Sequence, residues 1–375
     1  MDFTFTEEQQ AAAEAARTVL AGTAPDGVPS PQESPGAVDG DFDRGLWRTL
    51  ADADLLGLLA GPGHGGSGLD PVALCLVLRE AGRALARVPL LETSAAAWTL
   101  RTYGSEALRA ARLPAIARGE LPVTVAAHGR TGHEAPQLAV DAARPSREDG
   151  DWLLDGVQTA VPWGATAALV LVPARTAAGE DVLALVDPAA EGVTAHGQVS
   201  TNGEAYAELE LREVRVPDRD VIVADGAVEA LRRLLATGTC ALALGLGEKV
   251  LEMTAEYTGR REQFGHPVAT FQAVAVQTAD RFIDLRAMAA TLWQAAWRLE
   301  PRDVAVAKIW AAEGVRRVVQ TAQHLHGGFG TDTTYPLHRF HAWAKQLELA
   351  HGPAPAHEAE LAALLATDEA ETAPA

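Results

Sequence analysis

The chain has 375 residues, of which 48% are hydrophobic and 22% are charged, an ordinary balance for a globular protein with a large core. Its formal net charge of -19 argues against a general nucleic-acid or anionic-membrane surface. An anionic ligand therefore needs a local basic pocket, which four arginines could supply: Arg260, Arg261, Arg281 and Arg286.

The N-terminus shows no basic region followed by an apolar core, so no signal peptide is predicted. No apolar run looks long enough to span a bilayer, and we expect a cytoplasmic protein. Cys75 and Cys240 lie in apolar helical runs and do not form a disulfide framework, so we expect buried free thiols.

The first third of the chain has helical patterns. Thr6 precedes two acids and predicts a helix N-cap. The segment 23–43 is rich in Pro, Gly, Ser and acids and predicts a loop. The glycine-rich stretch 61–69 has no Lys-Ser/Thr ending, so it indicates a tight turn between helices rather than a phosphate loop. The other predicted helices span 46–59, 71–85, 93–103 and 105–118.

The pattern changes near Gly119 to short runs rich in Val and Leu, separated by Gly, Pro and Asp. Such runs predict strands of a small barrel or sandwich. The predicted strands span 123–127, 152–154, 167–172, 182–186 and 207–211. Long helical patterns return after residues 220–226 and continue to about Leu365, before an acidic tail that we expect to be frayed.

Two adjacent arginines lie on the turn between two of these long helices. The first helix runs through Leu231 to Val250, and Gly265 and Pro267 end it. The second is predicted to have one apolar face that consists of Phe282, Leu285, Ala289, Leu292, Ala296 and Leu299. An Arg fork there suits a pyrophosphate, and Phe264 or Phe271 could cover a ring system. A solvated Arg pair beside a core Phe is the alternative, and residue types alone favour it.

The residue types and their spacing in this turn resemble those of the acyl-CoA dehydrogenase family. It reads Arg261-Glu-Gln-Phe-Gly265, then Pro267, Phe271-Gln272, Gln277 and Asp280. About fifty residues later come Gln323-His-Leu-His-Gly-Gly-Phe-Gly330 and Tyr335-Pro336, where the family has a flavin-contacting Gly-Gly loop. The order of helices, strands and helices also matches, so the resemblance covers nearly the whole chain.

This resemblance implies a mainly α fold with a β-domain. It consists of an N-terminal helical domain at 1–119, a middle β-barrel or sandwich at 120–225, and a C-terminal four-helix bundle at 226–368. Residues 369–375 are predicted to be a disordered tail.

The resemblance also implies FAD as cofactor and an acyl-CoA thioester as substrate. In the family a carboxylate removes the α-proton while the β-carbon gives a hydride to flavin, and an electron-transfer protein accepts the electrons. The turn crosses a dimer interface to a neighbour's FAD. The residues implied in FAD binding are Arg261, Gln263, Phe264, Phe271, Gln272, His324, Gly327 and Gly328.

Two parts of the active site depart from the family pattern. Ala160-Val161-Pro162 stands where a Trp-Ile-Thr packs on the flavin ring, and Trp163 next to it is expected to be a core residue. The family's catalytic glutamate falls on His351, and the second known position falls near the apolar Leu235. Glu348 would share a helical face with His351 if the helix continued. A neutral His can serve as a base, so His351 is either the base or a residue of a site that has lost its base.

Three hypotheses follow. The chain is the base-lacking partner in a heteromer, of the kind associated with bulky acyl-CoA substrates such as steroid side chains. Alternatively it is a self-sufficient homo-oligomer that uses His351 or Glu348, or it is a non-catalytic scaffold subunit. The histidines at 324, 326, 338 and 341 lack the spacing of metal ligands, so no metal is expected.

Overall fold

The computed structural model describes residues 4–23, 41–127, 140–143 and 150–372, so most of the expected loop at 23–43 lies outside the described residues. The N-terminal part is helical, as predicted. Its helices are α1 (Glu7–Leu20), α2 (Arg44–Asp52), α3 (Pro71–Ala84), α4 (Leu90–Tyr103) and α5 (Glu106–Ala117). Thr6 caps α1, and Gln9 completes a capping box. The helix expected over 46–59 ends at Asp52, because Asp54 adopts a left-handed backbone with φ 57°.

The middle part forms one mixed sheet among the described residues, in the order β6-β7-β3-β2-β4-β5-β8, with β1 beside β4. The expected barrel or sandwich is therefore a single eight-stranded sheet. Its strands are β1 (Val123–Val125), β2 (Val140–Ala143), β3 (Asp151–Pro162), β4 (Leu169–Thr176), β5 (Asp181–Val186), β6 (Val193–Val199), β7 (Ala205–Pro217) and β8 (Val221–Ile222). The strands β2, β6 and β8 are short or polar, and the sequence pattern did not predict them.

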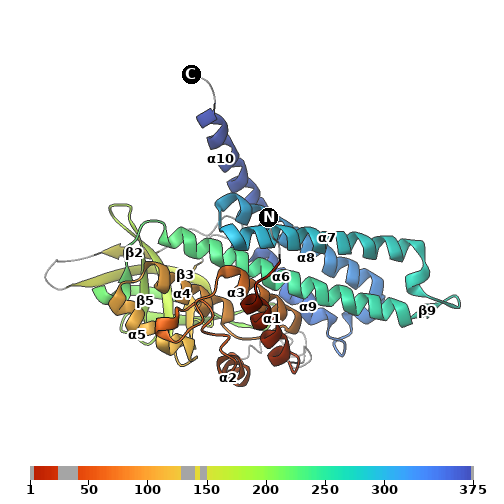
Figure 1. Ribbon diagram of the computed structural model, residues 1–375, viewed down its shortest axis with the longest axis horizontal. Helices are drawn as coiled ribbons and strands as arrows, with labels where there is room; N and C mark the ends of the chain where they lie inside the picture. The colour runs from red at the N-terminus through yellow and green to blue at the C-terminus, as the bar shows by residue number, and fades with distance from the viewer. Residues whose placement is uncertain (1–3, 24–40, 128–139, 144–149, 373–375) are drawn as a thin grey trace.

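The C-terminal part is a helical bundle. Its helices are α6 (Ala227–Arg260), α7 (Gln272–Arg298), α8 (Pro301–His326), α9 (Leu337–Leu349) and α10 (Ala354–Thr372). Figure 1 shows α6 to α9 lying side by side and α10 projecting from the body, while α3 packs against α6 and α1 packs against α3. Helix α10 continues to Thr372, four residues into the tail that was expected to be disordered from residue 369.

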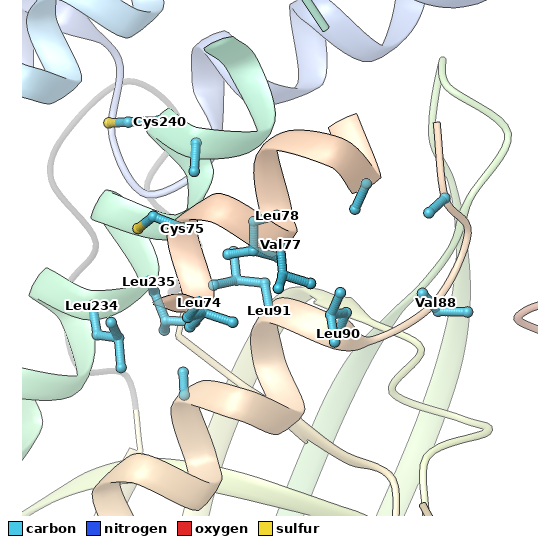
Figure 2. Close-up of a cluster of buried hydrophobic side chains, with 14 of the residues drawn as sticks. Leu74, Cys75, Val77, Leu78, Val88, Leu90, Leu91, Leu234, Leu235 and Cys240 are labelled. Carbon is cyan, nitrogen blue, oxygen red and sulfur yellow. The ribbon is translucent and has the colours of Figure 1, made fainter. Parts of the chain in front are cut away.

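Helix α6 is the central helix of the molecule. It contacts α3, α4, α7, α8 and α9, and most of its length is buried. Contrary to expectation, α6 is long and apolar enough to cross a membrane, but 78% of that apolar window is buried inside the protein, as in the core helix of a globular protein. Figure 2 shows its Leu234 and Leu235 close to Leu74 of α3. Cys75 and Cys240 are both free and buried, as predicted, and burial raises the pKa of the Cys240 thiol to about 12.

Helix α7 leaves an apolar face in solvent. Of the residues predicted on one apolar face, Leu285, Leu292 and Ala296 are buried, whereas the surface of Phe282 is 58% exposed. Near the hairpin end the more protected positions are those of the partly buried Arg281 and the buried Asp284, which form an ion pair at 3.0 Å. The stripe that contacts α6 and α8 therefore passes beside Phe282 rather than through it.

Close packing of α6 on α3 gives a test of the fold. A Cβ at Gly245 would lie 1.8 Å from the Arg79 carbonyl oxygen, whereas a Cβ at Gly259 of the same helix meets nothing within 4 Å. We expect Gly245→Ala to lower the free energy of unfolding by about 1–3 kcal/mol through overpacking. Gly259→Ala should instead raise it by about 0.5–1 kcal/mol, since Ala favours helix. Urea denaturation of both variants measures this, and equal effects at the two sites would contradict the packing argument.

Candidate functional site

The turn after α6 forms a small exposed hairpin. Strands β9 (Glu262–Gln263) and β10 (His266–Pro267) pair antiparallel, and the two residues between them have positive φ, 53° at Phe264 and 78° at Gly265. Two such residues make the tight turn whose twist matches a hairpin. The Phe264 side chain is 91% exposed and lies edge-on to Phe271, with ring centroids 6.4 Å apart. The alternative of a core Phe at this turn is therefore wrong.

The two arginines of the turn differ in their partners. Arg260 Nη1 pairs with Glu256 at 2.8 Å. The Arg261 guanidinium has no ion pair or hydrogen bond within the part of the chain that the structure describes, while its backbone is held by Tyr257 and Val268. An exposed guanidinium on a fixed backbone is ready to bind an oxyanion from outside the chain.

The other residues implied in cofactor binding are distributed around this turn. Gln263 and Gln272 are exposed, and the Gln263 amide donates to the carbonyl of Glu262 at 2.8 Å. Gly327 and Gly328 are exposed in the 3-10 turn Gly327–Thr331 that follows α8. Gly327 has φ 59° and ψ -140°, a conformation that favours glycine.

Four aromatic rings connect the Gly-Gly loop to the end of α6. Tyr257 stacks on His326 at 4.4 Å and on Phe329 at 5.4 Å, and Tyr335 lies 4.5 Å from Phe329. Burial lowers the pKa of His326, so its ring is neutral at neutral pH. The sequence pointed to His324, but His324 is exposed, and the buried His326 joins the stack instead.

A cavity of about 380 Å³ lies against this stack. It is lined by Met253, Glu256, Tyr257, Arg260, Arg261 and Tyr335. The fold thus brings Arg261 and the Tyr335 that follows the Gly-Gly loop to one place. Arg281 and Arg286 do not line this cavity. Arg281 is instead paired with Asp284. The expected basic pocket therefore contains two arginines.

A second cavity, of about 300 Å³, lies at the other end of the bundle, where the chain's own active site is expected. Its walls include Trp163, Trp343 and His351. Trp163 is only 2% exposed and packs edge-on against Phe42 at 6.0 Å, as expected of a core residue, although one side of it also faces the cavity. The carboxyls of Glu92 and Glu204 also line this cavity, and burial raises the pKa of both. These carboxyls make the cavity unfavourable for an anionic group.

His351 lies in the loop after α9. It has a left-handed backbone with φ 57°, and its carbonyl oxygen lies 2.9 Å from Nε2 of His357. The expected shared face of Glu348 and His351 is wrong, because α9 ends at Leu349. The Glu348 carboxylate pairs with Lys345 at 2.6 Å and does not line the cavity, and Leu235 is fully buried in the core. A carboxylate is therefore missing from both positions where the family places its base.

A buried lysine fixes the end of α9. Lys308 of α8 is fully buried, and its Nζ donates to the carbonyl oxygens of Leu347 and Glu348 at 3.2 and 3.0 Å. These are carbonyls of the last helical turn, which have no partner inside the helix. The ammonium thus positions the segment that leads into His351. Burial lowers the pKa of Lys308 to about 8.

Comparison with known proteins agrees with this geometry. Residues 6–120 match the model of the acyl-CoA dehydrogenase N-terminal domain, and residues 230–364 match that of the C-terminal domain. The chain belongs to the acyl-CoA dehydrogenase family, whose members are oxidoreductases that use FAD and act on the CH–CH bond of an acyl-CoA.

Three proteins illustrate the similarity. The acyl-CoA dehydrogenase FadE27 of Mycobacterium tuberculosis is 37% identical over 94% of this chain and 96% of its own length. The ChsE4-ChsE5 complex from Mycobacterium tuberculosis contains a chain that is 35% identical, with a TM-score of 0.88 and full coverage of both chains. A variant of the Tcur3481-Tcur3483 steroid ACAD is 34% identical, with a TM-score of 0.87 over 97% of this chain and 99% of that one.

The residues of the exposed turn fit the phosphate-bearing side of FAD, because Arg261 is a free cation at the edge of an open cavity. The second cavity fits the redox ring poorly, because two carboxyls line it and Ala160 to Pro162 replace the aromatic wall. Among the described residues no group of three His, Cys, Asp or Glu side chains could hold a metal ion.

The buried Lys308 gives a prediction for pH dependence. Its pKa falls from 10.5 to about 8 on folding, so between these values the unfolded chain binds a proton that the folded chain does not. The free energy of unfolding should therefore rise with pH from 8 to 10.5 through this group, by at most about 1.4 kcal/mol per pH unit. Lys308→Met should remove this slope, whereas Lys345→Met, at an exposed lysine, should keep it. Urea denaturation at several pH values measures the slopes, and an unchanged slope in Lys308→Met would contradict the assignment.

Proposed function

We propose that this chain is the base-lacking subunit of a heteromeric, FAD-dependent acyl-CoA dehydrogenase. The observation that carries the proposal is the pairing of an intact, exposed Arg261 turn with His351 in the place of the catalytic carboxylate. A subunit of this kind completes the flavin site of a neighbour and leaves proton abstraction to that neighbour. The names of the similar proteins support it, since two of them are complexes of two different chains and one is called a steroid ACAD.

The exposed face of α7 supports an interface beside the turn. Phe271, Val276, Phe282 and Ile283 follow one another along the first part of this helix, and the last two are 58% and 63% exposed. Apolar side chains grouped in this way mark surfaces that another protein covers. A partner that covers them would also enclose the Arg261 hairpin and keep water from the flavin.

In this proposal each residue of the chain has a defined task. FAD, when bound, accepts the hydride from the acyl-CoA. Arg261 compensates the charge of the pyrophosphate, while Phe264 and Phe271 shield the bound dinucleotide from solvent. The aromatic stack of Tyr257, His326, Phe329 and Tyr335 holds the Gly-Gly loop against α6. None of these residues moves a proton, which agrees with a subunit that has no base.

The two alternative functions, a self-sufficient homo-oligomer and a scaffold subunit, require different roles of His351. A self-sufficient homo-oligomer needs His351 as base, or Glu348, which its ion pair with Lys345 holds outside the cavity. A scaffold subunit needs neither His351 nor Arg261. We further propose that the enzyme acts in the cytoplasm on a bulky acyl-CoA of the steroid side-chain type and passes its electrons to an electron-transfer protein.

The first test concerns Arg261. Truncation of one partner of a partly dry Arg–phosphate pair typically costs about 2–5 kcal/mol. We therefore expect Arg261→Ala to lose FAD from the assembled complex while the complex stays folded. Arg118→Ala is the matched control, since it removes the same charge from an exposed side chain that Glu120 already holds and that does not line this cavity. Flavin absorbance after gel filtration measures the loss, and full retention of FAD in Arg261→Ala would exclude the proposed role.

The second test concerns His351. If the partner supplies the base, His351→Ala should leave the rate of flavin reduction by acyl-CoA nearly unchanged in the heteromer. If His351 is the base, the substitution should lower this rate at least about a hundredfold, and the wild-type rate should fall as pH drops and the imidazole takes up a proton. Stopped-flow single-turnover reduction with and without the partner distinguishes these cases. Fast reduction by this chain alone, abolished by His351→Ala, would overturn the proposal.

A further inference from the structure

The cavity of about 300 Å³ at the end of α9 has no task in the proposed function. It lies among α3, α4, α6, α9 and the sheet, since its walls come from all of them. Its volume is at the lower end of the roughly 300–1,000 Å³ of small-molecule sites. An enclosed space of this size holds a compact organic molecule.

Most of the cavity wall is apolar. The apolar side chains come mainly from the helices, and they include Leu78, Val88, Leu90, Leu91, Leu242 and Leu347. Two indole rings, those of Trp163 and Trp343, complete the wall. A ligand with a hydrocarbon body would gain about 25 cal/mol for each Å² of apolar surface that it removes from water here.

Glu204 is a polar group of the cavity with its own partners. Its carboxylate accepts hydrogen bonds from Asn202 Nδ2 at 2.9 Å and from the Tyr206 hydroxyl at 3.2 Å. The buried guanidinium of Arg87 lies near enough to lower the pKa of Glu204, although burial raises that pKa more strongly. The charge of Glu204 is therefore partly balanced within the protein.

Glu92 lacks such a balance. It is the third residue of α4, and within the described residues its carboxyl has no ion pair or hydrogen bond to another side chain. Burial raises its pKa, a hydrogen bond with its own backbone opposes this shift, and repulsion by Glu204 adds to it, with a net pKa of about 7. The carboxyl faces the cavity, where an incoming group can reach it.

The charges around the cavity select the head group of the ligand. Two carboxyls line it, Arg87 lies near Glu204, and His351 and Tyr206 are its other titratable groups. With both carboxyls ionised, the residues that the structure describes around the cavity carry one more negative charge than the Arg87 guanidinium balances. A carboxylate or another anion would meet repulsion, whereas a cation would complete a buried ion pair.

We propose that this cavity binds a compact apolar cation, a molecule with a hydrocarbon body and one ammonium group that pairs with Glu92. The proposal rests on the base-lacking function, because in a self-sufficient enzyme the same cavity beside His351 would hold the reacting groups. None of its residues belongs to the Arg261 turn, so FAD binding there is tested separately. Bound there, the cation lies against the His351 loop and the end of α9, so that it can influence the stability of this end of the subunit.

Three probes of equal shape test the proposal: cyclohexylamine, cyclohexanol and cyclohexanecarboxylate. In calorimetric titrations of the full chain with its partner at pH 8, the amine should bind, the alcohol at least tenfold more weakly, and the carboxylate not at all. Because the pKa of Glu92 is about 7, amine binding should weaken about tenfold from pH 8 to pH 6 as that carboxyl takes up a proton. The amine itself stays protonated throughout this range.

Two substitutions localise the binding. Glu92→Gln keeps the shape of the side chain, and it should weaken amine binding at least tenfold and remove its pH dependence. Glu8→Gln is the matched control, because Glu8 lies in the first turn of α1 on the surface, and it should change nothing. Thr239→Leu, which adds apolar bulk to the cavity wall on α6, should weaken all binding to the site.

Several results would overturn the proposal. They are no binding of the amine to the wild-type protein, equal affinity for the three probes, and equal losses in Glu92→Gln and Glu8→Gln. If Glu92→Gln does not fold, as judged by circular dichroism, the proposal is tested by the other two measurements. Amine binding that is independent of pH in the wild type, or unchanged in Thr239→Leu, would then overturn it. Unchanged FAD content in the variants separates failure here from failure of the Arg261 assignment.

Discussion

The close contact of α6 with α3 is the constraint on which the arrangement of both cavities depends. Only glycine fits at Gly245, opposite the Arg79 carbonyl, and at Gly82, opposite the Leu242 carbonyl. The contact is flanked by an ion pair between Arg79 and Glu248 at 2.7 Å. Because α6 is a single helix of 34 residues, fixing its middle fixes both of its ends. One part then lines the buried cavity with Thr239 and Leu242, and the other end presents the Arg261 hairpin to solvent.

The exposed end has features that a lone chain does not stabilise well. Phe264 adopts a left-handed backbone and is almost fully in water, and the nearby face of α7 is apolar. A non-glycine residue in this conformation is uncommon, and an apolar patch in water gains nothing from the hydrophobic effect. The apolar surface becomes favourable when a second surface covers it, and the left-handed backbone holds the Phe264 side chain out where a partner can do so. The geometry of the turn is thus explained by an assembly more readily than by a monomer.

The sequence predicted those features that depend on residues close together in the chain, and it missed those that depend on distant segments. The helices α3 and α5 end within a residue of the predicted bounds, because capping and apolar spacing are local. Trp163 was correctly expected in the core. The position of Glu92 in a cavity wall was not predicted, since Leu-Leu-Glu-Thr at the start of a helix looks like an ordinary first turn with a solvated acid. Its environment comes from Glu204 and from α9, which lie far along the chain.

The error at Glu348 and the unpredicted burial of His326 have a similar origin. His324 and His326 both lie near the end of α8, and the choice of the one that is buried depends on contact with Tyr257 of another helix. The shared face of Glu348 and His351 required α9 to continue, but the helix ends where Lys308 takes up its last carbonyls. The sequence around 350 gives no sign of that lysine, which comes from α8. Tertiary contacts therefore decided both cases.

Within the part of the chain that the structure describes, Arg261 and Glu92 have no counter-ion, and their surroundings give these charges opposite consequences. Arg261 is in water, where an unpaired guanidinium costs little and remains ready for a phosphate. Glu92 is only partly exposed, in the wall of a largely apolar cavity, where an unpaired carboxylate is costly, and its pKa is raised to about 7. A neutral Glu92 removes the cost of the charge but leaves a carboxyl in an apolar cavity without the hydrogen bonds that water would give. A cationic ligand would supply both the counter-charge and the hydrogen bonds that the Glu92 carboxyl lacks. The anionic groups of an acyl-CoA or a dinucleotide would supply neither. The same electrostatic reasoning that directs a dinucleotide to the Arg261 end therefore directs it away from the cavity beside His351.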